Sequence, residues 1–112
     1  MRVALVTGGG SGIGRSAALE LNKIDFTVYV VGRREEELIK TSSLATNNNH
    51  KIIPIKTDIT IGSQVIALFD KIKSDHGRID LLFNNAGMGA PRVPIEDLKA
   101  VSYTHLTLPT IR

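Results

Sequence analysis

Residues 3–16 read V-A-L-V-T-G-G-G-S-G-I-G-R-S. The first four are apolar and β-prone, which predicts a short buried strand that ends at Thr7. The glycines that follow permit backbone angles closed to other residues and leave the main chain open to a close approach. Apolar residues then recur at helical spacing, at Ile13, Ala17, Ala18 and Leu21. Because the first N–H groups of a helix lack partners within it, this order of strand, turn and helix predicts a phosphate site.

The same glycines fit two phosphate-binding patterns. Residues 9–16 match the G-x-x-x-x-G-K-[ST] loop of nucleotide triphosphatases, except that Arg15 stands in place of the lysine. A planar guanidinium is a poor substitute for that compact ammonium group. The pattern T-G-x-x-x-G-x-G is matched at every fixed position, by Thr7, Gly8, Gly12 and Gly14. On this pattern the sequence resembles the short-chain dehydrogenase/reductase family. A noncatalytic nucleotide-binding module, or a relative of the P-loop phosphohydrolases, stays open as the alternative.

Strand-like and helix-like segments alternate along the rest of the chain. Short apolar runs at residues 27–31, 52–55 and 79–83 predict three further strands. Residues 35–45 and a segment with an apolar stripe at 65–72 predict the helices between them. This alternation predicts the α/β class, as a truncated Rossmann-like doubly wound parallel sheet of about four strands in the order 3-2-1-4. Pro54 suits the edge position that this order gives the third strand.

The residues after the second strand bear on the choice of cofactor. In dinucleotide-binding folds an acidic residue here binds the ribose of NAD, whereas an arginine accommodates the 2′-phosphate of NADP. This chain has Gly32, Arg33 and Arg34. A cation is unfavourable at a helix N-terminus, so Arg33 predicts a bound anion, although both arginines could instead be solvated. One charge-assisted contact of about 1.5–3 kcal/mol predicts a roughly tenfold to hundredfold preference for NADP over NAD.

Two later segments extend the resemblance. Asp58, in T-D-I-T, matches the family's aspartate at the adenine edge, with the backbone of Ile59 beside it; the alternative is a turn residue before a helix capped by Thr60. The tetrapeptide N-N-A-G at 84–87 matches the family motif that places Asn85, Ala86 and Gly87 against the cofactor ribose and uses the asparagines to tie strands together; the alternative is asparagines that bond only their own turn. The resemblance implies a cofactor-binding set of Thr7, Gly8, Ser11, Gly12, Ile13, Gly14, Arg33, Asp58, Ile59, Asn85, Ala86 and Gly87.

The family's catalytic residues have no match in this chain. The family donates a proton from the tyrosine of Y-x-x-x-K, but Tyr103 is followed at that spacing by Thr107, and Tyr29 lies in a predicted buried strand. We therefore predict no catalytic residue, and the isolated histidines predict no metal site. The resemblance implies the N-terminal part of an NADP-preferring oxidoreductase, which binds cofactor without turnover. Its intact parent would transfer hydride between a carbonyl and an alcohol of a small-molecule substrate.

The end of the chain has a different character. Residues 101–110 read V-S-Y-T-H-L-T-L-P-T and resemble the translation of a transposase adapter used to prepare sequencing libraries. We expect residues 1–100 to form the NAD(P)-binding half-domain and residues 101–112 to be a non-native tail. A natural tail rich in threonine is the alternative.

Composition narrows the class of protein. A chain of 112 residues with 42% hydrophobic and 22% charged residues is typical of one soluble domain. The net charge of +3 is spread along the chain and only 4% of residues are aromatic, which argues against a nucleic-acid partner. The absence of cysteine excludes disulfides and zinc thiolate sites. Without an apolar run of membrane-spanning length or a signal peptide, we expect a cytoplasmic protein with no membrane partner. The resemblance implies a homo-oligomeric parent.

Overall fold

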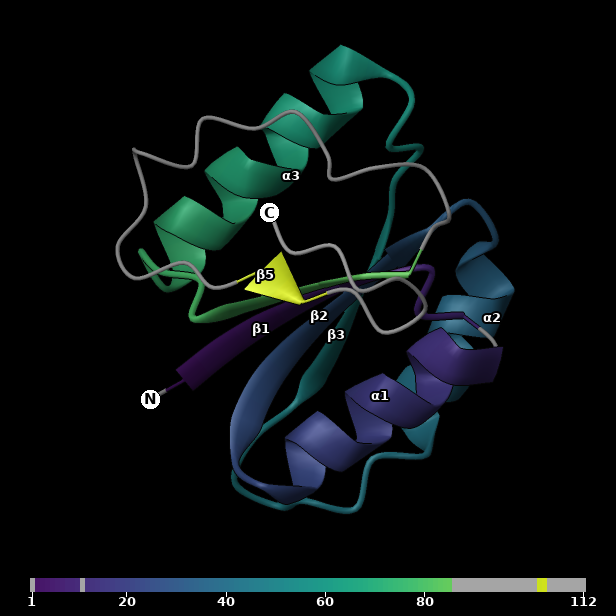
Figure 1. The fold of residues 1–112 in the computed structure, drawn as a ribbon, viewed down its shortest axis with the longest axis vertical. Coiled ribbons are helices and arrows are strands. Elements are labelled where there is room, and N and C mark those ends of the chain that lie inside the picture. The colour runs from purple at the N-terminus through teal and green to yellow at the C-terminus, as the bar shows by residue number, and fades with distance from the viewer. Residues whose placement is uncertain (1, 11, 86–102, 105–112) are drawn as a thin grey trace.

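A parallel sheet with helices on both faces organises the chain (Figure 1). The computed structural model describes residues 2–10 and 12–85, and the backbone of residues 103–104. The elements are β1 (Arg2–Thr7), α1 (Gly12–Lys23), β2 (Phe26–Gly32), α2 (Glu35–Ser43), β3 (Ile52–Lys56), α3 (Gly62–Asp75), β4 (Leu81–Asn84) and β5 (Tyr103–Thr104). The sheet order is β3-β2-β1-β4-β5, and every pair is parallel. The predicted α/β fold and its strand order 3-2-1-4 are thereby confirmed.

Two features of the sheet differ from the sequence prediction. The fourth strand begins at Leu81, two residues later than predicted. The carboxylate of Asp80 accepts the N–H of Val3 at 2.7 Å, while the N–H of Asp80 donates to Val3 O at 2.7 Å, so a side chain supplies one of the two hydrogen bonds at this point. Ile79, outside the strand, is still buried in the core. The second difference is β5, which pairs with β4 but is only two residues long, too short to give an apolar period.

The two central strands are buried on both faces. Val3, Leu5 and Tyr29 pack with the apolar stripe of α3. The alternate residues Ala4 and Val6 pack on the opposite face, in a cluster that also holds residues of α1 and α2. Figure 1 shows the same arrangement, with α1 and α2 on one side of the sheet and α3 on the other. Burial on both faces explains why these strands are continuous apolar runs rather than alternating ones.

Strand register brings the carboxyl ends of four strands to one edge of the sheet. Thr7 at the end of β1 lies opposite Val31 of β2 and Asn84 of β4. Gly32, the last residue of β2, lies opposite Lys56 of β3. The loops after β1, β2, β3 and β4 therefore start side by side, which is where ligands bind in open α/β sheets.

Pro54 lies in β3, at one edge of the sheet, as predicted. Lys51 O accepts the N–H of Val28 at 3.0 Å, and the N–H of Thr57 donates to Gly32 O at 2.8 Å, so these two residues turn their backbone groups toward β2. Backbone groups alternate in direction along a strand. Pro54 is three residues from both Lys51 and Thr57, so its backbone groups point the other way, toward the open edge of the sheet. The residue without an N–H thus occupies a position where β2 requires no donor.

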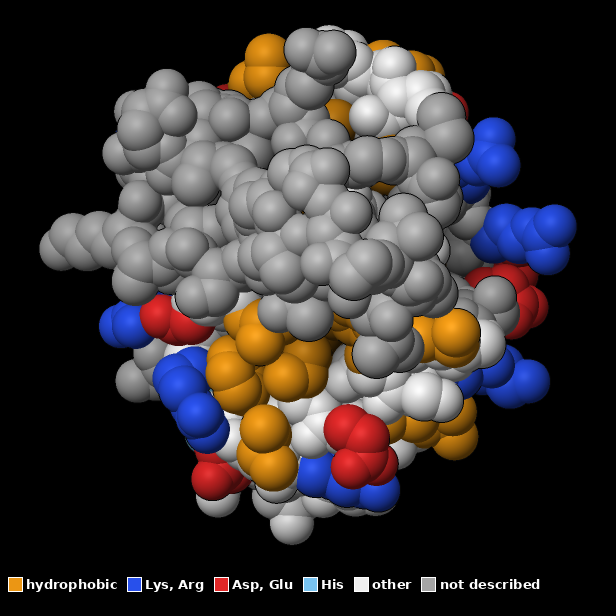
Figure 2. Space-filling view, in the orientation of Figure 1, with side chains coloured by type: hydrophobic (Ala, Val, Ile, Leu, Met, Phe, Trp, Pro, Cys, Tyr) orange, Lys and Arg blue, Asp and Glu red, His pale blue; other side chains and the backbone are white. Residues whose placement is uncertain are grey.

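Apolar side chains also reach the surface. Figure 2 shows hydrophobic side chains grouped in the lower part of one face, with charged side chains around them. On α1, Ile13 keeps 45% of its surface exposed and lines a pocket of about 560 Å³ with Ala17 and Phe83. Within residues 2–10 and 12–85, no helix is both long and apolar enough to cross a lipid bilayer.

Candidate functional site

The glycine loop after β1 is tied to the end of β2. The N–H groups of Gly8 and Gly9 both donate to Val31 O, at 2.9 and 3.2 Å. Gly8 has φ +67°, in the left-handed region that favours glycine. A ligand at this loop would therefore meet main-chain groups that the fold has already fixed.

The start of α1 lies directly against this loop on one side and is open on the other. A Cβ atom on Gly14 would lie 2.0 Å from Gly8 O, so only glycine permits this approach. Gly12 has φ +56°, yet a Cβ there would meet no atom within 4 Å. The first amides of a helix have no partner within it, and the helix dipole adds positive potential at that end. Gly12 thus marks an open side from which an anion can reach the main chain.

Asn84 at the end of β4 and Asn85 directly after it tie β4 to β1, as the resemblance implied. The hydroxyl of Thr7 donates to Asn84 Oδ1 at 2.8 Å, and the N–H of Asn85 donates to that same hydroxyl oxygen at 3.0 Å. The Asn85 side chain approaches the loop, since its Nδ2 would lie 3.5 Å from a Cβ atom on Gly8. Thr7, Gly8 and Asn85 are therefore brought together, whereas the predicted Ser11, Ala86 and Gly87 lie outside the described residues.

Arg33 lines two pockets that open at this edge of the sheet. One pocket, of about 420 Å³, is lined by Arg33, Asp58 and Ile59 together with Gly8, Val31, Gly32, Thr57 and Thr60. The other, of about 630 Å³, is lined by Arg33 and Arg34 together with Gly8, Gly10, Gly32, Glu37 and Leu38. Residues predicted from three separate segments of the chain therefore line two neighbouring pockets that share Gly8, Gly32 and Arg33.

Asp58 is held within its own loop by Thr60. Its Oδ1 accepts both the hydroxyl of Thr60 at 2.6 Å and the N–H of Thr60 at 3.0 Å. These two hydrogen bonds lower the pKa of Asp58 below its usual value, and the charge of Arg33 lowers it further. The predicted capping of α3 by Thr60 is wrong, because the helix begins at Gly62 after Ile61, whose side chain offers no cap. The threonine hydroxyl is used by Asp58 instead.

Arg15, which occupies the lysine position of the triphosphatase pattern, does not line the two pockets around Arg33. Its Nε donates to Thr41 Oγ1 at 2.9 Å, and its Nη2 contacts Glu37, both on α2. Only 19% of the Arg15 side chain is exposed. The structure therefore argues against a P-loop. The sequence prediction did not place Arg15, Glu37 and Thr41 together, and no local pattern links residues more than twenty positions apart.

Among the other titratable residues of the described segments, Tyr29 has structural contacts and no group forms a metal site. Tyr29 is buried in β2 as predicted, and its hydroxyl donates to Asp75 at 3.0 Å and lies 2.7 Å from His76 Nδ1. Burial and the Asp75 carboxylate raise the pKa of Tyr29 above its ordinary value of 10.0. Within residues 2–10 and 12–85 no three acidic or histidine side chains gather in a way that could hold a metal ion.

Comparison with known proteins identifies the family. The sequence profile of the short chain dehydrogenases matches residues 2–107. The chain therefore belongs to the short-chain dehydrogenase/reductase family, whose members bind NAD(P).

Individual relatives differ in how much of their length this chain covers. The short-chain dehydrogenase/reductase VdtF of Byssochlamys spectabilis is 37% identical over 92 residues, which are 82% of this chain and 30% of VdtF. The homolog YusS of Bacillus subtilis is 34% identical over 102 residues, which are 90% of this chain and 93% of YusS. The chain thus spans about a third of one relative and nearly all of the other.

Solved structures give the same fold with either nicotinamide dinucleotide. A metagenomic short-chain oxidoreductase in complex with NADP is 30% identical, with a TM-score of 0.73 over 79% of this chain and 40% of its own. A short-chain dehydrogenase/reductase of Burkholderia phymatum in complex with NAD is 36% identical, with a TM-score of 0.71 over 80% of this chain and 32% of its own. Family membership alone therefore leaves open which of the two cofactors this chain prefers.

Proposed function

We propose that this chain is the NADP-preferring cofactor-binding part of a short-chain oxidoreductase. The bound nicotinamide would exchange a hydride with the substrate, so that the intact protein reduces carbonyls or oxidises alcohols of a small molecule. The residues present here would bind and orient the dinucleotide.

The described residues fit such a cofactor. Gly12 offers an open cradle for a pyrophosphate at the start of α1, because a Cβ there would enter empty space. Asp58 and Ile59 line the pocket suited to the adenine, and Asn85 lies against the glycine loop near the position proposed for the ribose. Together with Arg33, the proposed set is completed by Thr7, Gly8, Ser11, Ile13, Gly14, Ala86 and Gly87.

The preference for NADP rests on one observation. Arg33 lines both pockets directly after β2, and residues 32–34 include no carboxylate. A carboxylate there would accept the ribose hydroxyls of NAD and repel a 2′-phosphate, whereas a guanidinium attracts the phosphate. One such contact corresponds to a roughly tenfold to hundredfold preference.

Binding without turnover is part of the proposal. The chain has no Y-x-x-x-K, since the residue four places after Tyr103 is Thr107. We also propose a cytoplasmic, homo-oligomeric parent, and a non-native tail at residues 101–112 after a cofactor-binding half-domain of residues 1–100. Genomic DNA across codon 100 tests the tail: a continuous frame that encodes residues 101–110 with codons unlike those of the adapter would refute it.

Titration of the purified chain tests the cofactor assignment. The change in NADPH and NADH fluorescence on binding gives both dissociation constants, and ATP with magnesium ions serves as the competing ligand. We expect the wild type to prefer NADPH at least tenfold, and Arg33→Asp to abolish or reverse that preference. Selective binding of ATP would favour the phosphohydrolase alternative, and an unchanged preference in R33D would refute the role of Arg33.

A further inference from the structure

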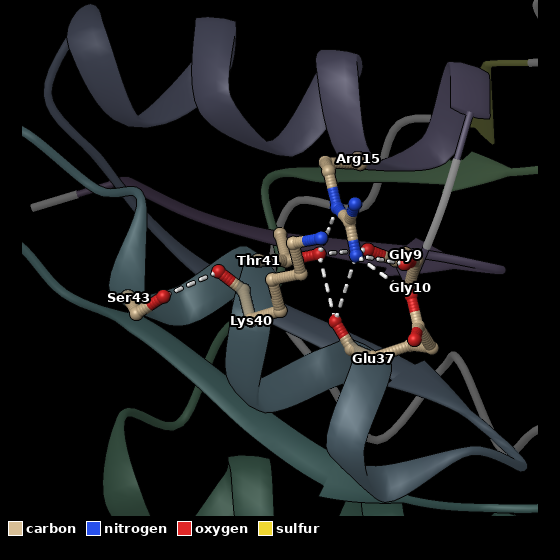
Figure 3. A network of polar contacts seen from close by, with 7 residues as sticks. All are labelled: Gly9, Gly10, Arg15, Glu37, Lys40, Thr41 and Ser43. Atoms are coloured by element: carbon tan, nitrogen blue, oxygen red, sulfur yellow. Dashed lines mark hydrogen bonds and ion pairs between the residues drawn. The ribbon is translucent and has the colours of Figure 1, made fainter.

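A network of hydrogen bonds and one ion pair joins the glycine loop to α2 (Figure 3). Arg15 projects from α1 toward α2, where its Nε donates to Thr41 Oγ1 at 2.9 Å. The Thr41 hydroxyl in turn donates to Gly9 O at 2.8 Å, and Arg15 Nη2 donates to Gly10 O. The carbonyl groups of two consecutive loop residues are thus held on the α2 side.

The same guanidinium pairs with a carboxylate that borders the cofactor region. Arg15 Nη2 lies 3.1 Å from Glu37 Oε1 and also 3.1 Å from Glu37 O. Glu37 lines the 630 Å³ pocket together with Arg33 and Arg34. A negative charge is therefore present at the wall of the pocket whose two arginines would receive a phosphate.

The partial burial of this ion pair strengthens its electrostatic interactions. The Arg15 side chain is only 19% exposed and that of Glu37 is 39% exposed, so water screens the pair less than it screens a fully exposed pair. An uncompensated Glu37 carboxylate would repel the doubly charged 2′-phosphate of NADP, whereas the ribose hydroxyls of NAD carry no charge for it to repel. Arg15 provides the compensating charge without lining the pocket.

We propose that Arg15 is a positioning residue for cofactor selectivity: it neutralises and holds Glu37, and so allows Arg33 and Arg34 to bind the 2′-phosphate of NADP. This inference rests on the function proposed above, since it presupposes that the chain binds NADP in preference to NAD. It assigns the selectivity in part to a side chain that lines neither pocket of the dinucleotide region.

The test compares the ratio of the dissociation constants of NADH and NADPH among variants of the whole chain. We expect Arg15→Met to lower this selectivity ratio by roughly threefold to tenfold, the size of a partly exposed charge interaction. Adding Glu37→Gln to that variant should restore the ratio to within about twofold, because the repelling charge is then gone. The loss in R15M should also shrink in high salt, since ions screen charges at the surface.

Two further variants separate charge from structure. Arg15→Lys keeps the positive charge but loses the planar fork, so it should retain the ratio even if both affinities fall. Lys23→Met removes another ion pair of α1, with Glu20 at 3.1 Å, and should leave the ratio unchanged. Circular dichroism checks that each variant is folded. If R15M does not fold, E37Q alone decides: it leaves the charge of Arg15 without its partner, so the ratio should rise by a similar roughly threefold to tenfold factor.

The outcomes distinguish this inference from the proposed function. Equal loss of NADH and NADPH affinity in R15M, with no rescue by E37Q, would mean that Arg15 only braces the loop, and would overturn the inference. An unchanged ratio in E37Q alone would also overturn it, because the charge of this ion pair would then have no effect on the binding of the 2′-phosphate. A wild-type chain that binds neither dinucleotide, or both equally, would instead refute the proposed function.

Discussion

Replacing Gly14 by alanine tests the contact between α1 and the glycine loop. The added Cβ would lie 2.0 Å from Gly8 O and 2.7 Å from Gly8 C, whereas ordinary contact begins at 3.4 Å. The helix or the loop must therefore move by more than 1 Å. Overpacking costs about 1–3 kcal/mol, and displacement of Gly8 also weakens its hydrogen bond to Val31, worth about 1 kcal/mol. We expect the free energy of unfolding to fall by about 2–4 kcal/mol.

Gly62 provides the matched control for this substitution. It also begins a helix, α3, but a Cβ there would meet nothing within 4 Å. Gly62→Ala should be neutral or stabilise the chain by about 0.4–1 kcal/mol. In urea unfolding followed by circular dichroism, we expect the midpoint of G14A to lie about 1–2 M below that of G62A. Equal midpoints would show that α1 does not lie against the Gly8 main chain, and would refute the geometry on which the site rests.

Two further predictions concern buried hydroxyl groups. Thr7→Val should lower the free energy of unfolding by about 1–3 kcal/mol, because the Thr7 hydroxyl bonds both Asn84 and Asn85 at a fully buried position. Thr7→Ser keeps a hydroxyl and should lose less stability. Equal urea midpoints for T7V and T7S would contradict this. Tyr29 has a pKa raised above 10 by burial, so its stabilising effect is complete below pH 10 and declines as the pH rises further. The unfolding free energy of the wild type should therefore fall more steeply above pH 10 than that of Tyr29→Phe, and parallel pH profiles would contradict it.

Much of the fold and part of the site could be predicted because the signals are local. Burial of β1 and β2 on both faces produces continuous apolar runs, and the stripe of α3 repeats with the helical period. Three glycines have separate local reasons: Gly8 and Gly12 have left-handed backbone angles, and Gly14 lets two backbones approach closely. These requirements determine residue type within a few positions, so the sequence alone records them.

The features that could not be predicted depend on contacts between distant segments. Arg15 contacts Glu37 and Thr41 across two elements, and neither periodicity nor any local motif specifies that meeting. Thr60 precedes α3 as a cap would, but a hydrogen bond with Asp58 competes for its hydroxyl. Likewise Ile79 has the composition of a strand residue, but the Asp80 carboxylate takes the N–H of Val3 and the strand begins only at Leu81. In each case a side-chain partner decides between conformations that the local sequence permits equally.

Because of Pro54, the two edges of the sheet differ in how well they can pair with a strand of another polypeptide. At the outer side of β3, a strand from a second molecule would find no donor at the middle of this five-residue element, so its hydrogen-bond ladder would be interrupted. On the opposite side, β4 accepts β5 as a parallel neighbour. Assembly of filaments by strand pairing at β3 is thereby disfavoured. A strand fused to this chain by design would pair better on the β4 side of the sheet than at β3.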